Sequence, residues 1–154
     1  MKKFLIYSDK ILTAITYAAY VALLIYIIVR FGFGADILKA LLIPATGFVL
    51  ETVIRDRLNF LRPYEKTGIP PIIPKKTKGH SFPSRHAFSV TMIAMMYVFY
   101  LPYLGVVMLV IAVCLCIIRV KGGVHSALDV TAGACLAAAY AAFFMWIFRL
   151  FINP

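Results

Sequence analysis

The chain has 154 residues, of which 63% are hydrophobic and 14% are charged. Soluble domains carry about 45 to 50% apolar and about 25% charged residues, so this composition indicates a membrane protein and excludes an ordinary soluble domain. The formal net charge of +10 falls in short segments between apolar runs, where it meets lipid headgroups or an anionic substrate, and this placement argues against a nucleic-acid-binding protein.

The first two apolar segments each predict a membrane-spanning helix. Residues 11–29 form an uncharged run of 19 residues, which is long enough to cross a bilayer, so we interpret it as a retained helix and not as a signal peptide. The second span is predicted over residues 37–54. Pro44 lies inside it, and neighbouring helices can satisfy the carbonyl group that a proline frees.

A long polar loop over residues 55–83 follows, and it holds five of the eight prolines. After it, residues 87–118 form an uncharged run of 32 residues. That run is roughly 48 Å long as a helix, whereas the hydrocarbon core is about 30 Å thick, so a single straight span cannot use it. Pro102 and Gly105 mark a turn, which predicts a hairpin of two helices over residues 84–101 and 103–120.

The last span is predicted over residues 126–148, and no soluble domain or repeat remains. The predicted fold class is therefore all-α, an integral membrane helical bundle of about five transmembrane helices that forms a single domain over residues 1–154. An odd number of spans places the N-terminus, the loop and the turn over residues 119–125 on one face of the membrane.

Eight polar side chains share that face: Arg55, Arg62, Ser84, Arg85, His86, Arg119, His125 and Asp129. Converging guanidinium groups suit a phosphate dianion, because each planar fork can bind two of its oxygens. Ser84 and His86 follow Pro83 at the predicted start of the third helix, where free backbone N–H groups and the helix dipole add a second anion-binding element.

Two histidines beside a phosphate site indicate in-line displacement at phosphorus. His125 is the better candidate nucleophile, because Asp129 lies four residues later and one helical turn brings its carboxylate to the imidazole ring. Such a contact fixes the tautomer and stabilises charge on the ring, as the third member of a catalytic triad does. His86 is left as the general acid that protonates the departing oxygen.

These residues resemble the three-part signature of the type 2 phosphatidic acid phosphatase (PAP2) superfamily, which reads K-x6-R-P, P-S-G-H and S-R-x5-H-x3-D. The resemblance covers residues 55–129, with the three parts in the family's order. The chain departs from the pattern at three positions, where Arg55 replaces Lys, Arg85 replaces Gly and Ile118 replaces Ser. A side chain at position 85 removes the backbone freedom of glycine, although its N–H group can still bind an anion.

The resemblance implies a PAP2/haloperoxidase-like helical core and a hydrolase that needs neither a metal nor another cofactor. It implies a lipid phosphate or lipid pyrophosphate as substrate and a phosphohistidine intermediate. Carried over to this chain, His125 is the nucleophile, Asp129 its partner and His86 the acid. The phosphate-binding residues are then Arg55, Arg62, Ser84, Arg85 and Arg119. Isoprenyl pyrophosphate, phosphatidylglycerol phosphate and phosphatidic acid all remain open as substrates, together with monophosphate or pyrophosphate preference.

Two other functions remain as alternatives, namely lipid phosphotransfer to an acceptor other than water and non-catalytic lipid binding in the membrane. The second is disfavoured because both histidines and Asp129 are present. The vanadate haloperoxidases of the superfamily are disfavoured by the predicted spans. We expect a multi-pass protein of the cell membrane with membrane lipids and no nucleic acid as partners, and the sequence leaves its oligomeric state open.

The sequence and the resemblance differ on the side of the membrane that the site faces. The predicted site face carries 13 Lys and Arg residues and the opposite face carries 3, which by the positive-inside rule places the site in the cytoplasm. The resemblance instead suggests an extracytoplasmic site, so the side stays open.

Overall fold

The computed structural model describes residues 2–151, and this part of the chain forms six helices and no strands. Their bounds are α1 (Lys2–Phe31), α2 (Ala35–Leu58), α3 (Pro63–Thr67), α4 (Arg85–Tyr100), α5 (Pro102–Lys121) and α6 (Ala127–Phe151). The segments that contain α1, α2, α5 and α6 are long and apolar enough to cross a membrane. The prediction of an all-α membrane bundle is confirmed.

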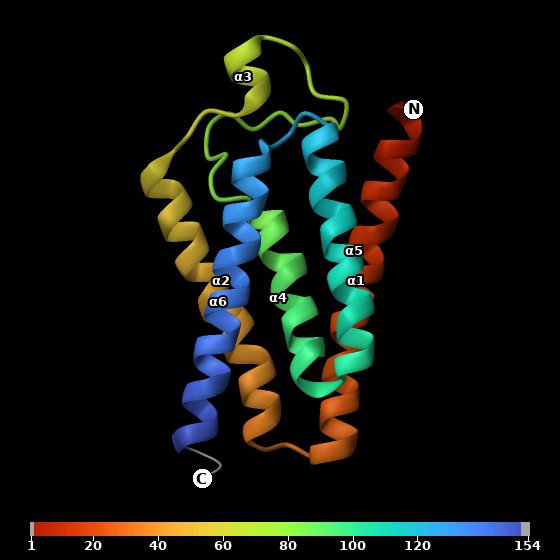
Figure 1. The fold of residues 1–154 in the computed structure, drawn as a ribbon, viewed down its shortest axis with the longest axis vertical. Coiled ribbons are helices and arrows are strands. Elements are labelled where there is room, and N and C mark those ends of the chain that lie inside the picture. The colour runs from red at the N-terminus through yellow and green to blue at the C-terminus, as the bar shows by residue number, and fades with distance from the viewer. Residues whose placement is uncertain (1, 152–154) are drawn as a thin grey trace.

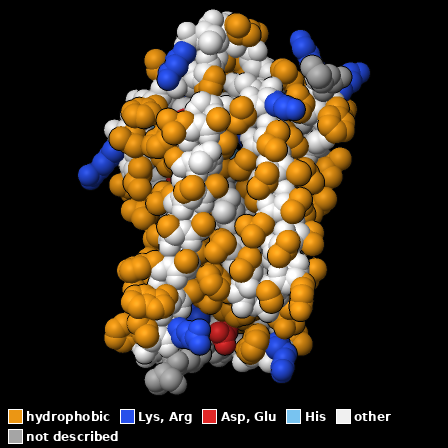
Figure 2. Space-filling view, viewed as in Figure 1, with side chains coloured by type: hydrophobic (Ala, Val, Ile, Leu, Met, Phe, Trp, Pro, Cys, Tyr) orange, Lys and Arg blue, Asp and Glu red, His pale blue; other side chains and the backbone are white. Residues whose placement is uncertain are grey.

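The outer surface of the bundle is that of a protein immersed in lipid. Figure 2 shows hydrophobic side chains along the whole length of the helices, with Lys and Arg gathered toward the two ends. Large apolar residues such as Val29, Tyr103 and Val106 are exposed. Exposed apolar surface on this scale is unfavourable in water, so the bundle belongs in a bilayer.

The parts of the chain that carry the predicted site residues lie at one end of the bundle. The start of α1, the segment that contains α3, and the turn between α5 and α6 all lie there, whereas α6 ends at the opposite end (Figure 1). The α4–α5 hairpin turns at Pro102, which occupies the first position of α5, where the missing N–H group of proline costs no hydrogen bond.

The segment predicted as a loop over residues 55–83 is partly helical, which corrects that prediction. Arg55 lies in the last turn of α2, which ends at Leu58. Basic side chains are favourable in the last turn of a helix, so the charged residues here extend α2 beyond its apolar part. Arg55 is therefore held by a helix, and α3 forms a second short helix within the segment.

The helix α4 lies at the centre of the bundle, and it contacts α1, α2, α5 and α6. Its 16 residues span roughly 24 Å at 1.5 Å per residue, less than the hydrocarbon thickness of about 30 Å. Phe88, Met92 and Met96 are buried in the core. Because α4 is short, its first turn begins deeper in the bundle than the ends of α5 and α6 (Figure 1). His86, which lies in this first turn, is therefore set deeper in the bundle than the ends of α5 and α6.

A glycine allows α6 to lie against the start of α4. A Cβ atom on Gly133 would lie 2.5 Å from the carbonyl oxygen of Ser84, closer than van der Waals contact permits. The backbone N–H of Ser84 donates to the carbonyl oxygen of Asp129 at 2.9 Å. This close approach brings Asp129 next to the segment that carries Ser84 and His86.

Candidate active site

A polar cavity of about 490 Å³ lies at the end of the bundle where α1 begins. Six of the eight side chains predicted for the site line it: Arg55, Arg62, Arg85, His86, Arg119 and His125. They come from α2, the segment after it, α4, α5 and the turn before α6. The fold therefore brings together residues that lie up to 70 positions apart, while Ser84 and Asp129 lie behind the cavity wall.

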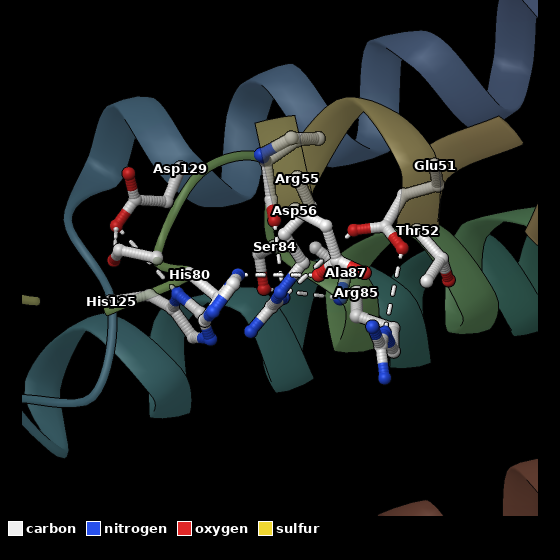
Figure 3. A network of polar contacts seen from close by, with 12 residues as sticks. Glu51, Thr52, Arg55, Asp56, His80, Ser84, Arg85, Ala87, His125 and Asp129 are labelled. Carbon is white, nitrogen blue, oxygen red and sulfur yellow. Dashed lines mark hydrogen bonds and ion pairs between the residues drawn. The ribbon is translucent and has the colours of Figure 1, made fainter. Parts of the chain in front are cut away.

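His125 and Asp129 face each other at the start of α6. Nδ1 of His125 lies 3.6 Å from Oδ2 of Asp129, which is an ion-pair distance longer than a hydrogen bond. Both side chains are buried, and Figure 3 shows them at one end of the polar network. With Nδ1 turned to the carboxylate, Nε2 is the ring nitrogen left to react in the cavity.

Two serines hold the Asp129 carboxylate in place. Oδ2 of Asp129 accepts a hydrogen bond from Oγ of Ser81 at 2.6 Å and another from the N–H of Ser126 at 2.8 Å. Oγ of Ser126 in turn accepts from the N–H of Asp129 at 3.1 Å. This reciprocal pair is a capping box at the start of α6. Asp129 thus caps the start of α6 and faces His125 with the same side chain.

The surroundings of His125 favour its neutral form. Burial lowers the pKa of His125 below its ordinary value of 6.5, and the nearby cations Arg62 and Arg55 lower it further. The Asp129 carboxylate acts in the opposite direction and does not reverse the effect of burial. A neutral imidazole keeps the lone pair that a nucleophile needs.

His86 lies in the first turn of α4 and contacts two other helices. Its Nε2 lies 3.2 Å from Oγ1 of Thr13 in α1, and Nη2 of Arg119 in α5 lies 3.4 Å from both ring nitrogens. A donor at equal distances from Nδ1 and Nε2 cannot lie along the lone pair of either one. Arg119 therefore packs against the imidazole and leaves the ring nitrogens to other partners.

Ser84, predicted as a phosphate ligand, is the N-cap of α4. Its side chain is fully buried, and its Oγ accepts a hydrogen bond from the N–H of Ala87 at 3.4 Å. Contact between Ser84 and a phosphate stays a prediction.

Arg62 is almost completely buried, with 2% of its surface exposed. Its guanidinium group donates to the carbonyl oxygens of Gly79 at 3.0 Å, Val124 at 3.4 Å and His80 at 3.4 Å. These contacts join the segment after α3 to the turn before α6. A guanidinium has five N–H donors, so two remain for a ligand.

A buried carboxylate, Glu51, lies between Arg55 and Arg85. Its Oε1 is 3.8 Å from Nη1 of Arg55, and its Oε2 is 3.5 Å from Nε of Arg85. Arg55 also donates to the carbonyl oxygen of Pro83 at 3.2 Å, and the Arg85 guanidinium lies 5.3 Å from the centre of the Phe48 ring. Figure 3 shows Glu51 and Arg85 at the end of the network away from His125.

Several residues of the site were not predicted from the sequence: Asp9, Thr13, Glu51, Ser81 and Ser126. Two of them carried a usable signal. Glu51 precedes Arg55 by four residues, which places both side chains on one face of a helix. Ser126 and Asp129 match the spacing of a capping box. Asp9, Thr13 and Ser81 reach the site only through the tertiary fold.

The cavity is strongly positive. Besides the arginines, Lys75 and Lys78 line it, and Asp56 is its one acidic lining residue. Clustered cations of this kind favour an anionic ligand, and a phosphate dianion fits this chemistry. Among residues 2–151, no group of three or more His, Cys, Asp or Glu side chains is placed to hold a metal ion.

Comparison with known proteins adds a family and two similar folds. The PAP2 superfamily profile matches residues 36–152. The fold is similar to the crystal structure of the first transmembrane PAP2 type phosphatidylglycerolphosphate phosphatase from Bacillus subtilis, with a TM-score of 0.69 and 23% identity, covering 99% of this chain and 84% of that chain. It is also similar to Aquifex aeolicus LpxE, with a TM-score of 0.72 and 20% identity, covering 90% of this chain and 85% of that one. No curated protein sequence matches the chain.

Proposed function

We propose that this chain, which belongs to the PAP2 superfamily, removes a phosphate from a lipid phosphate or lipid pyrophosphate at the membrane interface. In this proposal the reaction needs no metal ion and passes through a phosphohistidine. The observation that carries it is the buried His125, whose Nδ1 lies 3.6 Å from Oδ2 of Asp129, in a cavity that it shares with His86 and the arginines.

The first step is attack by Nε2 of His125 on phosphorus, in line with the bond to the leaving oxygen. An N–P bond forms and the P–O bond to the lipid breaks. His86, whose protonated form is favoured by the negative charge of the bound phosphate, donates a proton to the departing oxygen, which leaves as an alcohol or as a shorter phosphate. Charge that develops on the His125 imidazole is stabilised by the Asp129 carboxylate, which Ser81 and Ser126 hold in place.

The second step returns the protein to its starting state. Neutral His86 accepts a proton from a water molecule, and the resulting hydroxide attacks phosphorus. The N–P bond breaks and inorganic phosphate leaves, so the proton that His86 gave in the first step is recovered in the second. An acceptor alcohol in place of water would make the same site a phosphotransferase.

The phosphate oxygens are bound by cations from three elements. Arg55 and Arg119 come from α2 and α5, and Arg62 contributes its two remaining N–H donors. The N–H group of Arg85 lies at the start of α4, where free backbone N–H groups bind anions. Together these donors replace the charge that a metal ion supplies in other phosphatases.

A lipid substrate is supported by the position of the cavity at one end of a membrane bundle, where headgroups lie. Isoprenyl pyrophosphate, phosphatidylglycerol phosphate and phosphatidic acid are the candidates, and the name of the Bacillus subtilis protein of similar fold favours including the second.

The test is phosphate release by purified protein from a panel of these three lipids, with EDTA present throughout and His125→Ala as the control. We expect release from at least one lipid by the wild type and none by the variant. Loss of activity in EDTA that Mg²⁺ restores would contradict a metal-independent reaction. Transfer to an added alcohol without release to water would favour the phosphotransferase, and binding without turnover would favour a lipid-binding protein.

A further inference from the structure

The helix α1 brings two polar side chains to the candidate site from outside the part of the chain that matches the family. Asp9 is buried, with 6% of its surface exposed, and its Oδ1 lies 2.9 Å from Nε of Arg119. Thr13 places its Oγ1 3.2 Å from Nε2 of His86. Both contacts are made to residues that the proposed mechanism uses directly.

The two contacts come from one face of α1. Asp9 and Thr13 are four residues apart, so they lie one above the other on the helix. Tyr17, one further turn along, lines the polar cavity. This face of α1 therefore forms one wall of the site, although residues 2–31 precede the matched region, which begins at residue 36.

We propose that Asp9 and Thr13 are positioning residues for the reaction. Asp9 binds the Nε side of the Arg119 guanidinium, which leaves the four N–H groups on Nη1 and Nη2 for the substrate phosphate. Thr13 binds Nε2 of His86, so that Nδ1 is the nitrogen that exchanges a proton with the leaving oxygen. This inference rests on the proposed function, because both residues act through groups to which that function assigns roles.

The Thr13 contact holds the His86 ring in one orientation, with Nε2 toward α1, through both steps. In the protonated ring, Nε2–H donates to the Thr13 hydroxyl and Nδ1–H donates to the leaving oxygen. After that proton is transferred, Nε2 keeps its hydrogen, and the lone pair of Nδ1 is ready to accept the proton of the attacking water. Without the hydroxyl, the ring loses the contact with α1 that keeps Nδ1 turned toward the leaving oxygen.

The two residues should give different kinetic signatures. Arg119 binds the phosphate, which every substrate has, so loss of Asp9 should affect all substrates alike and mainly through KM. His86 acts on the leaving oxygen, so loss of Thr13 should lower kcat for a poor leaving group far more than for a good one. A residue that only stabilises the fold has no reason to produce either pattern.

The test for Thr13 compares Thr13→Val with Thr13→Ser on a lipid alkyl phosphate and on an aryl phosphate. Thr16→Val is the matched control, because Thr16 is buried in the same helix and its hydroxyl donates to the carbonyl oxygen of Leu12 at 2.8 Å. We expect Thr13→Val to lower kcat on the alkyl substrate about three- to tenfold, the effect of one hydrogen bond, with a much smaller loss on the aryl substrate. Thr13→Ser should restore the rate. Equal losses on both substrates, or no difference from Thr16→Val, would overturn the assignment.

The test for Asp9 compares Asp9→Ala, Asp9→Asn and Asp9→Glu with Asp36→Ala. Asp36 is the matched control, because it forms an ion pair with Lys39 at 3.2 Å near the start of α2, at the other end of the bundle. We expect Asp9→Ala to raise KM about 10- to 100-fold on both substrates, the size of one hydrogen bond between charged groups. The KM of Asp9→Asn should lie between those of the wild type and Asp9→Ala, and Asp9→Glu should recover part of the lost affinity. An Asp9→Ala variant with the kinetics of Asp36→Ala would contradict the proposal.

Wild type and His125→Ala are measured first, and the thermal midpoint of each variant in detergent shows that it is folded. A wild type that hydrolyses neither substrate contradicts the proposed function, and the positioning roles with it. A wild type that hydrolyses both, with Thr13→Val and Asp9→Ala matching their controls, contradicts the positioning roles alone.

Discussion

Glu51 and Arg85 form an ion pair between α2 and the first residue of α4, with Oε2 of Glu51 at 3.5 Å from Nε of Arg85. Glu51 is fully buried, and neither of its carboxylate oxygens accepts a hydrogen bond from the described residues. Its charge is therefore offset by Arg85 and by Arg55, whose Nη1 lies 3.8 Å from it. These two arginines occupy two of the positions at which the chain departs from the family signature, so both departures surround one carboxylate.

We predict that the Glu51–Arg85 pair is coupled. Arg85→Gly restores the family residue but leaves the buried carboxylate with Arg55 alone, so it should destabilise the protein by about 1 to 3 kcal/mol, less than for a fully buried pair because Arg85 is partly exposed. The double variant Glu51→Gln/Arg85→Gly should lose less free energy of unfolding than the sum of the losses in the two single variants. Unfolding in detergent measures this, with Arg57→Gly as the control for an exposed arginine. Strictly additive losses of unfolding free energy would mean that the contact between Glu51 and Arg85 contributes nothing to stability.

The pH dependence of the reaction follows from the lowered pKa of His125. Burial lowers the pKa of His125 below its ordinary value of 6.5, so the imidazole is still neutral at pH 6.5. The acid limb of the pH profile of kcat/KM should therefore lie below pH 6.5. Asp129→Asn removes a group that raises this pKa, so it should move the limb to still lower pH. It should also reduce the plateau about 100-fold or more, because the charge on the ring is no longer stabilised.

The wild type and Asp129→Asn are compared on the same substrate. The substrate phosphate has a second pKa of about 6, and its ionisation then contributes equally to both pH profiles. A limb that moves to higher pH in Asp129→Asn would contradict the proposed role of His125.

The side of the membrane that the site faces is a separate prediction. With 13 Lys and Arg residues at the site end and 3 at the other, the positive-inside rule places the site in the cytoplasm. In a background without Cys114, Cys116 and Cys135, Thr77→Cys in the exposed segment after α3 reports on the site end, and Phe33→Cys, exposed between α1 and α2, reports on the opposite end.

A membrane-impermeant thiol reagent applied to intact cells should label Phe33→Cys and should reach Thr77→Cys only after permeabilisation. The reverse pattern would place the site outside the cytoplasm. It would show that the count of Lys and Arg residues does not determine the orientation of this chain.

The fold could be predicted from the sequence because each signal it needed was local. Pro102 divides an uncharged run too long for one span, and Asp129 follows His125 at helical spacing. The end of α2 was predicted too early, because the charges after residue 54 suggested a loop, whereas cations also stabilise the last turn of a helix.

The contacts around the site were less accessible to sequence reasoning. Asp9 lies 110 positions before Arg119, and only the packing of α1 against α5 brings them together. Arg62 was predicted to bind phosphate, which stays a prediction, and the structure shows that three of its donors join two segments of backbone. The identity of a residue cannot reveal such a structural role, because the partner groups are carbonyl oxygens, which every residue carries.

The measurement that tests the account most directly is a search for phosphate bound covalently to His125. Wild-type protein mixed with lipid phosphate labelled with ³²P at the terminal phosphate, and quenched within one turnover, should carry acid-labile, base-stable label on the peptide that contains His125. His86→Ala should accumulate more of it with an aryl phosphate, because water attack then lacks its base. His125→Ala should carry none and release no phosphate. Wild-type rates of phosphate release by His125→Ala would contradict the phosphohistidine mechanism.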